Sequence, residues 1–166
     1  VDYQKWNIEG AADPSTAGNS GVISWDKYSN RCLDVLNNSR NNGTNIQLSN
    51  CKNNTAQTWY FDGTQIRLYD DPSKCLDLYN NLPNNGQNIQ LYNCNASTTA
   101  QKWYYDGFTK AFHSGRDFTK CIDVAGGENE LGANIQLLAC DGSSNQAFTI
   151  KDGGQNYHHY GEIYLD

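Results

Sequence analysis

The sequence predicts an all-β domain that closes on itself through three homologous repeats. Three observations lead to this prediction: a composition poor in helix formers, a set of motifs that occurs three times, and six cysteines whose spacing recurs. Asn, Gly and Asp together make up 51 of the 166 residues, whereas Glu occurs four times. Because Asn, Gly and Asp favour turns and have poor helix propensity, the composition excludes a helical bundle.

Length and charge narrow the class of protein further. A chain of 166 residues suggests one domain. No apolar run approaches the roughly 18 residues that a membrane-spanning helix needs. The net charge of −6 leaves no basic surface that could neutralise phosphates. We therefore expect neither membrane insertion nor binding of nucleic acid.

Three segments of the chain share one motif order: residues 21–62, 63–106 and 107–152. Each contains Cys-apolar-Asp-apolar, then Asn-Ile-Gln-Leu, then a second Cys, and finally Gln-x-aromatic. The Asp precedes the Gln of the second motif by 13 residues in all three, and the final Gln recurs after 44 and 45 residues. Such constant spacing is the signature of a repeat architecture.

Each repeat, about 44 residues long, carries four short apolar segments between Asn, Gly and Ser turns, which predicts four strands. The expected strands lie at about 22–25, 32–36, 45–49, 58–62, 65–69, 75–79, 88–92, 102–106, 110–114, 121–125, 134–138 and 147–151. Three such units leave sheet edges exposed unless they close into one barrel. A propeller has a similar period but normally uses at least four blades. The sequence therefore predicts a β-trefoil, which is a threefold barrel with hairpin caps.

The ends of the chain lie outside the repeats. We expect the β-trefoil to occupy residues 21–152. Residues 1–20 are interpreted as an N-terminal extension or a linker from a preceding module, and residues 153–166 as a C-terminal extension. Alternatively, residues 1–8 and 162–165 pair as strands beside the barrel.

The cysteines predict one disulfide in each repeat. Successive cysteines are 19, 24, 19, 27 and 19 residues apart, and equivalent units should form equivalent bonds. The expected pairs are Cys32–Cys51, Cys75–Cys94 and Cys121–Cys140. On the chain-entropy account, each bond stabilises the fold by about 3 kcal/mol, which supplements a small aliphatic core. Without a Cys-x-x-Cys motif or interleaved His residues, we expect no metal and no cofactor.

Paired cysteines also indicate an oxidising compartment, so we expect a secreted, extracellular protein. Four Asn-x-Ser/Thr sequons fit a secreted glycoprotein. The candidate glycosylation sites are Asn37, Asn42, Asn53 and Asn95.

Strand geometry predicts a binding site in the second repeat. Because side chains alternate between the two faces of a strand, Asp77 shares a face with Cys75, and Gln90 shares one with Tyr92 and Cys94. A Cys75–Cys94 bond would bring these faces together and place a carboxylate, an amide and an aromatic ring around one patch. This combination suits a sugar, whose hydroxyls need fixed acceptors and donors and whose C–H face needs an apolar ring.

The other two repeats lack the ring, because Ser49 and Leu138 stand where the second repeat has Tyr92. We therefore rank the second repeat as the main site, the third as weak and the first as the least active. The polar residues expected in these weaker sites are Asp34 and Gln47 in the first repeat, and Asp123 and Gln136 in the third.

The threefold pattern Cys-Leu-Asp-Val, Asn-Ile-Gln-Leu and Gln-x-Trp resembles the ricin B-type (R-type) lectins and the family 13 carbohydrate-binding modules over residues 21–152. The resemblance implies a β-trefoil with QxW repeats. In those lectins the residue before the QxW motif is often an Asn that contacts the sugar, and here it is Ala56, Ala100 or Asn145. Asn145 therefore joins the candidate site of the third repeat. Gln101 joins that of the second, where we expect it mainly to hold Asp77 by hydrogen bonds.

These residues predict carbohydrate binding without catalysis. The resemblance implies galactose- or N-acetylgalactosamine-terminated glycans as ligands. One alternative is an accessory module that holds a larger secreted glycoside hydrolase or toxin on xylan or another polysaccharide. Another is a protein-binding trefoil, such as a protease inhibitor. Glycoside hydrolysis normally needs two carboxylates facing each other across the substrate, whereas the repeated Asp residues belong to three separate lobes, so we expect no enzymatic activity.

Overall fold

The computed structural model describes residues 20–152 and 155–156 of the chain. In this part of the chain the regular secondary structure consists of β-strands and of single 3-10 turns of three residues each. None of these helices is long or apolar enough to cross a membrane. The extensions predicted at the two ends lie outside the described residues, apart from Ser20 and residues 155–156.

Each repeat contributes four strands. The first repeat contains β1 (Ser20–Trp25), β2 (Tyr28–Val35), β3 (Thr44–Asn50) and β4 (Trp59–Phe61). The second contains β5 (Ile66–Leu68), β6 (Asp71–Leu78), β7 (Ile89–Asn93) and β8 (Trp103–Asp106). The third contains β9 (Ala111–Ser114), β10 (Lys120–Val124), β11 (Ile135–Ala139) and β12 (Phe148–Asp152), and β13 (Gln155–Asn156) follows.

Five 3-10 turns connect these strands at equivalent places. They are η2 (Leu36–Asn38), η3 (Tyr79–Asn81), η4 (Thr99–Gln101), η5 (Ala125–Gly127) and η6 (Ser144–Gln146). The turns η2, η3 and η5 directly follow the Cys-apolar-Asp-apolar motif of the three repeats, and η4 and η6 contain the Gln of the QxW motif.

All twelve predicted strands are present, which confirms the all-β prediction. The starts of β2 and β6 were predicted four residues too late, because residues 28–31 and 71–74 are mostly polar and show no alternation. Pairing with the preceding strand extends both, through Trp25 opposite Tyr28 and Leu68 opposite Asp71.

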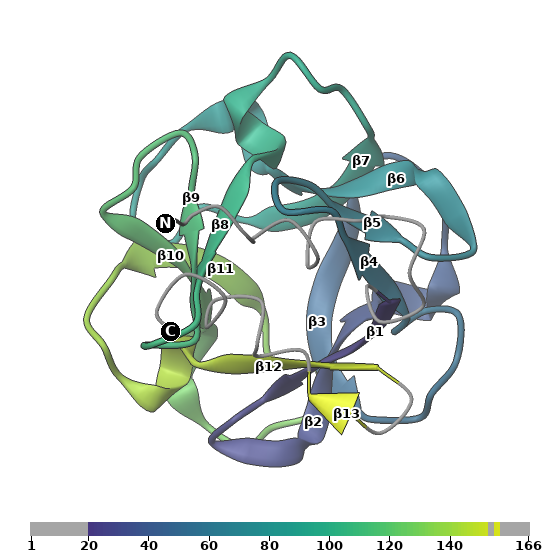
Figure 1. Ribbon diagram of the computed structural model, residues 1–166, viewed down its shortest axis with the longest axis vertical. Helices are drawn as coiled ribbons and strands as arrows, with labels where there is room; N and C mark the ends of the chain where they lie inside the picture. Colours follow the sequence, from purple (N-terminus) through teal and green to yellow (C-terminus); the bar gives the residue numbers. More distant parts are fainter. Residues whose placement is uncertain (1–19, 153–154, 157–166) are drawn as a thin grey trace, which may run out of the picture.

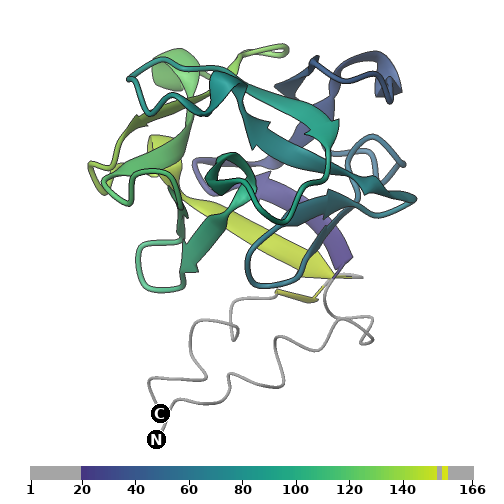
Figure 2. The same ribbon diagram turned by 90° about the horizontal axis from the view of Figure 1, so that it is seen from above.

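The chain closes into a barrel through contacts between its beginning and its end. Strand β1 pairs antiparallel with β12, with Ile23 opposite Ile150, and also pairs with β4. In Figure 2, the yellow β12 and the purple β1 run next to each other along the lower side of the barrel. Backbone hydrogen bonds from Gly43 N to Leu91 O and from Gly86 N to Leu137 O join the first repeat to the second and the second to the third.

The hairpins β2–β3, β6–β7 and β10–β11 occupy three sectors around a common axis (Figure 1). A ring of three side-chain hydrogen bonds lies where they meet. Asn45 Nδ2 donates to Asn134 Oδ1, Asn88 Nδ2 donates to Asn45 Oδ1, and Asn134 Nδ2 donates to Asn88 Oδ1, at 2.8–2.9 Å. The Asn of the Asn-Ile-Gln-Leu motif therefore joins the three repeats to one another.

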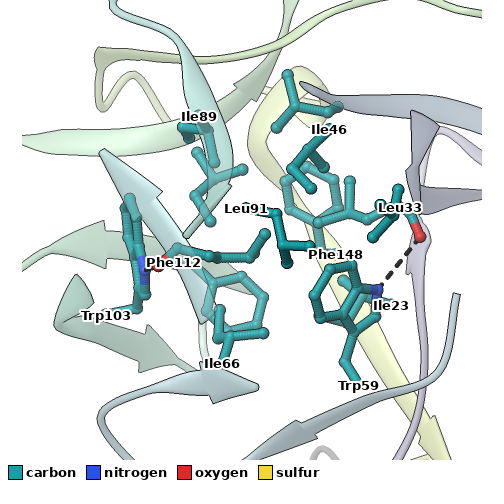
Figure 3. Close-up of a cluster of buried hydrophobic side chains, with 14 of the residues drawn as sticks. Ile23, Leu33, Ile46, Trp59, Ile66, Ile89, Leu91, Trp103, Phe112 and Phe148 are labelled. Atoms are coloured by element: carbon teal, nitrogen blue, oxygen red, sulfur yellow. Dashed lines mark hydrogen bonds between the residues drawn. The ribbon is translucent and has the colours of Figure 1, made fainter. Parts of the chain in front are cut away.

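The core lies inside this barrel and is lined by the same motif positions in each repeat (Figure 3). The QxW aromatics Trp59, Trp103 and Phe148 are at most 1% exposed. Trp59 Nε1 donates to Leu33 O at 3.2 Å, and Trp103 Nε1 donates to Leu76 O at 3.2 Å (Figure 3 draws the first). Phe148 fills the third position without such a donor.

The three predicted disulfides, Cys32–Cys51, Cys75–Cys94 and Cys121–Cys140, are all formed. Each joins the Cys-apolar-Asp-apolar strand of a repeat to the segment after its Asn-Ile-Gln-Leu strand. The cysteine spacing therefore predicted the connectivity correctly.

Candidate functional site

In each repeat, the Asp of the Cys-apolar-Asp-apolar motif lies between two glutamine amides. In the second repeat Asp77 lies opposite Gln90 in the β6–β7 register, and Gln90 Nε2 donates to Asp77 Oδ1 at 3.0 Å. Gln101 Nε2 donates to Asp77 Oδ2 at 2.9 Å. The same triad forms from Asp34, Gln47 and Gln57 in the first repeat, and from Asp123, Gln136 and Gln146 in the third.

Gln101 is a buried residue whose hydrogen-bonding capacity is used within the protein. Besides Asp77, its Nε2 donates to Asn93 O at 2.8 Å. Its Oε1 accepts from Asn95 N at 2.7 Å and from Gln65 Nε2 at 3.2 Å. Both N–H groups and both oxygen lone pairs thus have partners. Gln101 acts on the site by positioning Asp77, in line with the structural role expected from the sequence.

The Asp77 carboxylate keeps unused acceptor capacity. Each oxygen receives one amide hydrogen bond and has two lone pairs, so each can accept a second hydrogen bond. The side chain is 7% exposed, and this burial raises the pKa of Asp77 above the ordinary 3.8, while the hydrogen bonds from Gln90 and Gln101 oppose the shift. Asp77 is therefore a fixed carboxylate with room for two further hydrogen bonds.

A cavity of about 890 Å³ opens onto this carboxylate. Asp77 and Gln90, both 7% exposed, line it together with Tyr92, which is 43% exposed. Tyr92 lies opposite Cys75 in the strand register, so the Cys75–Cys94 disulfide is adjacent to it. The structure brings together the four residues that the sequence assigned to the second repeat. Gly43 of the first repeat also lines the cavity, held by a hydrogen bond from its N–H to Leu91 O at 2.8 Å.

The third repeat forms the triad but surrounds it differently. Asp123 is 1% exposed, and burial raises its pKa as well. Lys27 Nζ donates to Gly127 O at 2.6 Å and to Asn145 Oδ1 at 3.4 Å. A Cβ atom at Gly127 would lie 2.6 Å from Asn145 Oδ1, so the two residues are packed tightly together. The Asn145 side chain is engaged within the protein, and Asp123 is less accessible than Asp77.

The first repeat leaves Asp34 8% exposed, about as much as Asp77. The half-buried Ser49 stands in the position of Tyr92, so Asp34 has no aromatic ring beside it at that place. The acceptor is therefore present in all three repeats, and the surroundings distinguish them.

One cluster of metal-ligating residue types occurs in the described part of the chain, formed by His113, Cys121 and Cys140. The two sulfurs are bonded to each other, so neither is a thiolate that could bind a metal. His113 Nδ1 lies 2.8 Å from Phe118 O. This cluster is a disulfide with a neighbouring imidazole.

Two residues near the second site had no role in the sequence-based prediction. Gln65 is 5% exposed and contacts Gln101, whereas the corresponding strand positions of the other repeats carry Val22 and Ala111. Tyr79, 47% exposed, lines the cavity from η3. Comparison among the three repeats would have identified both, because each differs in type from its two counterparts.

The described arrangement agrees with the family to which the sequence is similar. The family model of the ricin-type β-trefoil lectin domain matches residues 19–146. The chain belongs to this family. Membership supports carbohydrate binding as the general function of this lectin domain. No curated protein sequence matches the chain.

Solved structures show the same fold. ThreeFoil, a designed threefold-symmetric protein, has a TM-score of 0.71 and 22% identity, covering 78% of this lectin domain's chain and 96% of its own. The earthworm R-type lectin C-half, solved with GalNAc, has a TM-score of 0.66 and 20% identity, covering 80% and 98%. An exo-β-1,3-galactanase from Clostridium thermocellum has a TM-score of 0.70 and 23% identity, covering 80% of this chain and 30% of the galactanase. At these identities the likeness shows the fold.

Proposed function

We propose that this domain binds carbohydrate without catalysing a reaction, and that its main site is the cavity of the second repeat. One observation carries the proposal: Asp77, held by two amides with acceptor capacity to spare, lies in the same cavity as the half-exposed Tyr92. A carboxylate can accept two sugar hydroxyls, and an aromatic ring can desolvate the C–H face of a pyranose.

Asp34 and Asp123 are held in the triads of the first and third repeats, away from this cavity, whose lining includes neither. Glycoside hydrolysis normally needs two carboxylates facing each other across the substrate. Neither of the other two repeated Asp residues can therefore serve as the second carboxylate in this cavity. The site is suited to recognition.

Galactose- or N-acetylgalactosamine-terminated glycans are the first candidate ligands. The earthworm lectin of the same fold was solved with GalNAc, which supports this choice. Ala100 stands where an Asn often contacts the sugar in related lectins, and this substitution supports a second candidate, a polysaccharide such as xylan. In that case the domain would serve as the accessory module of a larger secreted glycoside hydrolase or toxin.

The three disulfides and the lectin fold support an extracellular location. All four sequon asparagines, Asn37, Asn42, Asn53 and Asn95, are exposed, as glycosylation would require. A single open site of this kind should bind at about −4 to −7 kcal/mol, which corresponds to roughly millimolar to ten-micromolar Kd.

A glycan array tests the proposal, followed by competition with galactose, lactose and xylo-oligosaccharides. Binding to arrayed glycans that a free sugar displaces supports it, and the sugar that competes identifies the ligand class. Inhibition of a protease, together with binding that ignores every free sugar, would instead support the protein-binding trefoil.

A further inference from the structure

The cavity of the second repeat contains a second aromatic residue. Tyr79 begins η3, two residues after Asp77, and its side chain is 47% exposed. It lines the same cavity as Tyr92, which is 43% exposed. No ring contact joins the two among the aromatic pairs of the described residues, so they do not stack on each other.

The backbone of Tyr79 is held on both sides. Its N–H donates to Asn88 O at 3.0 Å, and its carbonyl accepts from Gln87 Nε2 at 2.8 Å. Within the described part of the chain, the phenol has neither a hydrogen bond nor a ring contact, and the residue is absent from the core. The fold therefore fixes where Tyr79 emerges and leaves its ring free to contact a ligand.

The turn that carries Tyr79 is tied to the turn that carries Gln101. Asn81 Nδ2 donates to Thr99 Oγ1 at 3.1 Å, which links η3 to η4. Arg116 Nε donates to Asn81 O at 3.2 Å from the third repeat. Because Gln101 holds Asp77, these contacts keep Tyr79 in a defined place relative to the carboxylate.

The other repeats have no ring at this place. The residues two positions after Asp34 and Asp123 are Leu36 and Ala125. The second repeat thus differs from both in two positions at once, Tyr79 and Tyr92, and both line one cavity. At about 890 Å³ this cavity is near the upper end of the range of roughly 300–1,000 Å³ for small-molecule sites, which is more than a single hexose needs.

We propose that Tyr79 is a second stacking surface and that the site takes an oligosaccharide segment of at least two linked pyranoses. This inference rests on the proposed function, since Asp77 and Tyr92 hold one pyranose of the segment. Tyr79 stacks against an adjoining pyranose. The preferred ligand class is therefore an extended or internal glycan segment, for which a single terminal sugar is only part of the contact.

Calorimetric titration with one sugar series of increasing length, from the methyl glycoside to the tetrasaccharide, tests this. The series is built from the sugar that the glycan array selects. The variants are Tyr79→Ala, the conservative Tyr79→Phe, and Leu36→Ala as the matched control at the same place in the first repeat. Circular dichroism verifies that each variant is folded, which the exposure of Tyr79 and Leu36 favours.

We expect the affinity of the natural sequence to rise severalfold from the monosaccharide to the di- or trisaccharide. Tyr79→Ala should abolish this rise while leaving monosaccharide affinity unchanged, and Tyr79→Phe and Leu36→Ala should retain it. A natural-sequence affinity that is independent of length, or a rise that survives in Tyr79→Ala, would overturn the inference and leave the monosaccharide site standing. If no member of any series binds, the proposed function itself fails, and the inference fails with it.

Discussion

Gln65 Nε2 donates a hydrogen bond of 3.2 Å to Gln101 Oε1. The Nε2 of the same Gln101 amide donates to the Asp77 carboxylate. Gln65 in turn accepts from Arg67 at 2.5 Å, and Arg67 also contacts Asp62 and Pro72 O. In the other repeats the corresponding Gln57 and Gln146 accept a backbone N–H at Oε1, and no side chain among the described residues donates to that oxygen. The second repeat therefore has an additional contact that restrains its acceptor.

Replacing Gln65 by the Val of the first repeat tests the importance of this contact. Gln65→Val removes this hydrogen bond and the one from Arg67, each worth about 1 kcal/mol, so it should weaken sugar binding severalfold. Ser24→Ala is the control, because it removes a buried hydrogen bond, to Thr149 O, that lies outside the Asp77 triad. Calorimetry should show weaker binding in Gln65→Val only, with modest loss of thermal stability in both. Unchanged affinity in Gln65→Val would show that Gln101 needs no support beyond the backbone.

Tyr92→Ala should remove most of the binding. The ring is 43% exposed and contributes little to the core, so the thermal midpoint should change by no more than about one or two degrees. Ser49→Ala and Leu138→Ala are the matched variants in the other repeats, and we expect neither to reduce binding appreciably. An equal loss in all three variants would contradict the ranking of the repeats.

Binding should fall on mild acidification. Burial raises the pKa of Asp77 above 3.8, so this carboxyl protonates at a higher pH than an ordinary Asp does. Protonation removes an acceptor and sets an O–H against an amide donor. We expect affinity to be constant near neutral pH and to decrease as pH falls towards a midpoint above 3.8.

The fold should persist over that pH range. A carboxyl whose pKa is raised in the folded state stabilises the fold most in its protonated form, so acidification costs no stability through Asp77. Hydrogen bonds from Ser73 and Thr119 lower the pKa values of Asp71 and Asp117, whose contributions are lost only at lower pH. Titration followed in parallel by near-UV circular dichroism checks this. Simultaneous loss of binding and of the dichroism signal would contradict the assignment to Asp77.

The disulfides provide a matched pair of deletions. Cys75→Ala/Cys94→Ala and Cys32→Ala/Cys51→Ala each remove a bond of 19-residue separation, and each should lower the free energy of unfolding by about 3 kcal/mol. Binding, measured well below the melting temperature, should fall in the first variant because Tyr92 lies beside that bond. Equal loss of binding in both would mean that the disulfides act only through global stability.

The fold could be predicted largely from the sequence, since the motif spacing and the 19-residue cysteine gap recur in every repeat. The alternation of side chains along a strand, combined with the predicted Cys75–Cys94 bond, likewise placed Asp77 near Gln90, which lies opposite it in the strand register. The ring of Asn45, Asn88 and Asn134 was not predicted, because it depends on how the repeats meet around the axis.

Contacts between distant segments account for what the sequence did not reveal about the sites. Lys27 and Asn145 are 118 residues apart, and no local pattern indicates that Lys27 Nζ donates to Asn145 Oδ1. Gln65 and Gln101 are 36 residues apart, and their contact is buried. Tyr79 was overlooked because its position follows the Cys-apolar-Asp-apolar motif and has no constant residue type among the repeats.

The central claim is that the cavity containing Asp77 and Tyr92 is where sugar binds. Amide chemical-shift mapping by NMR, during titration with the glycan selected by the array, tests it most directly. The account predicts saturable shifts concentrated at Asp77, Gln90 and Tyr92, with the counterparts Asp34 and Asp123 nearly unchanged. Shifts centred on the first or third repeat, with the second repeat unaffected, would contradict it.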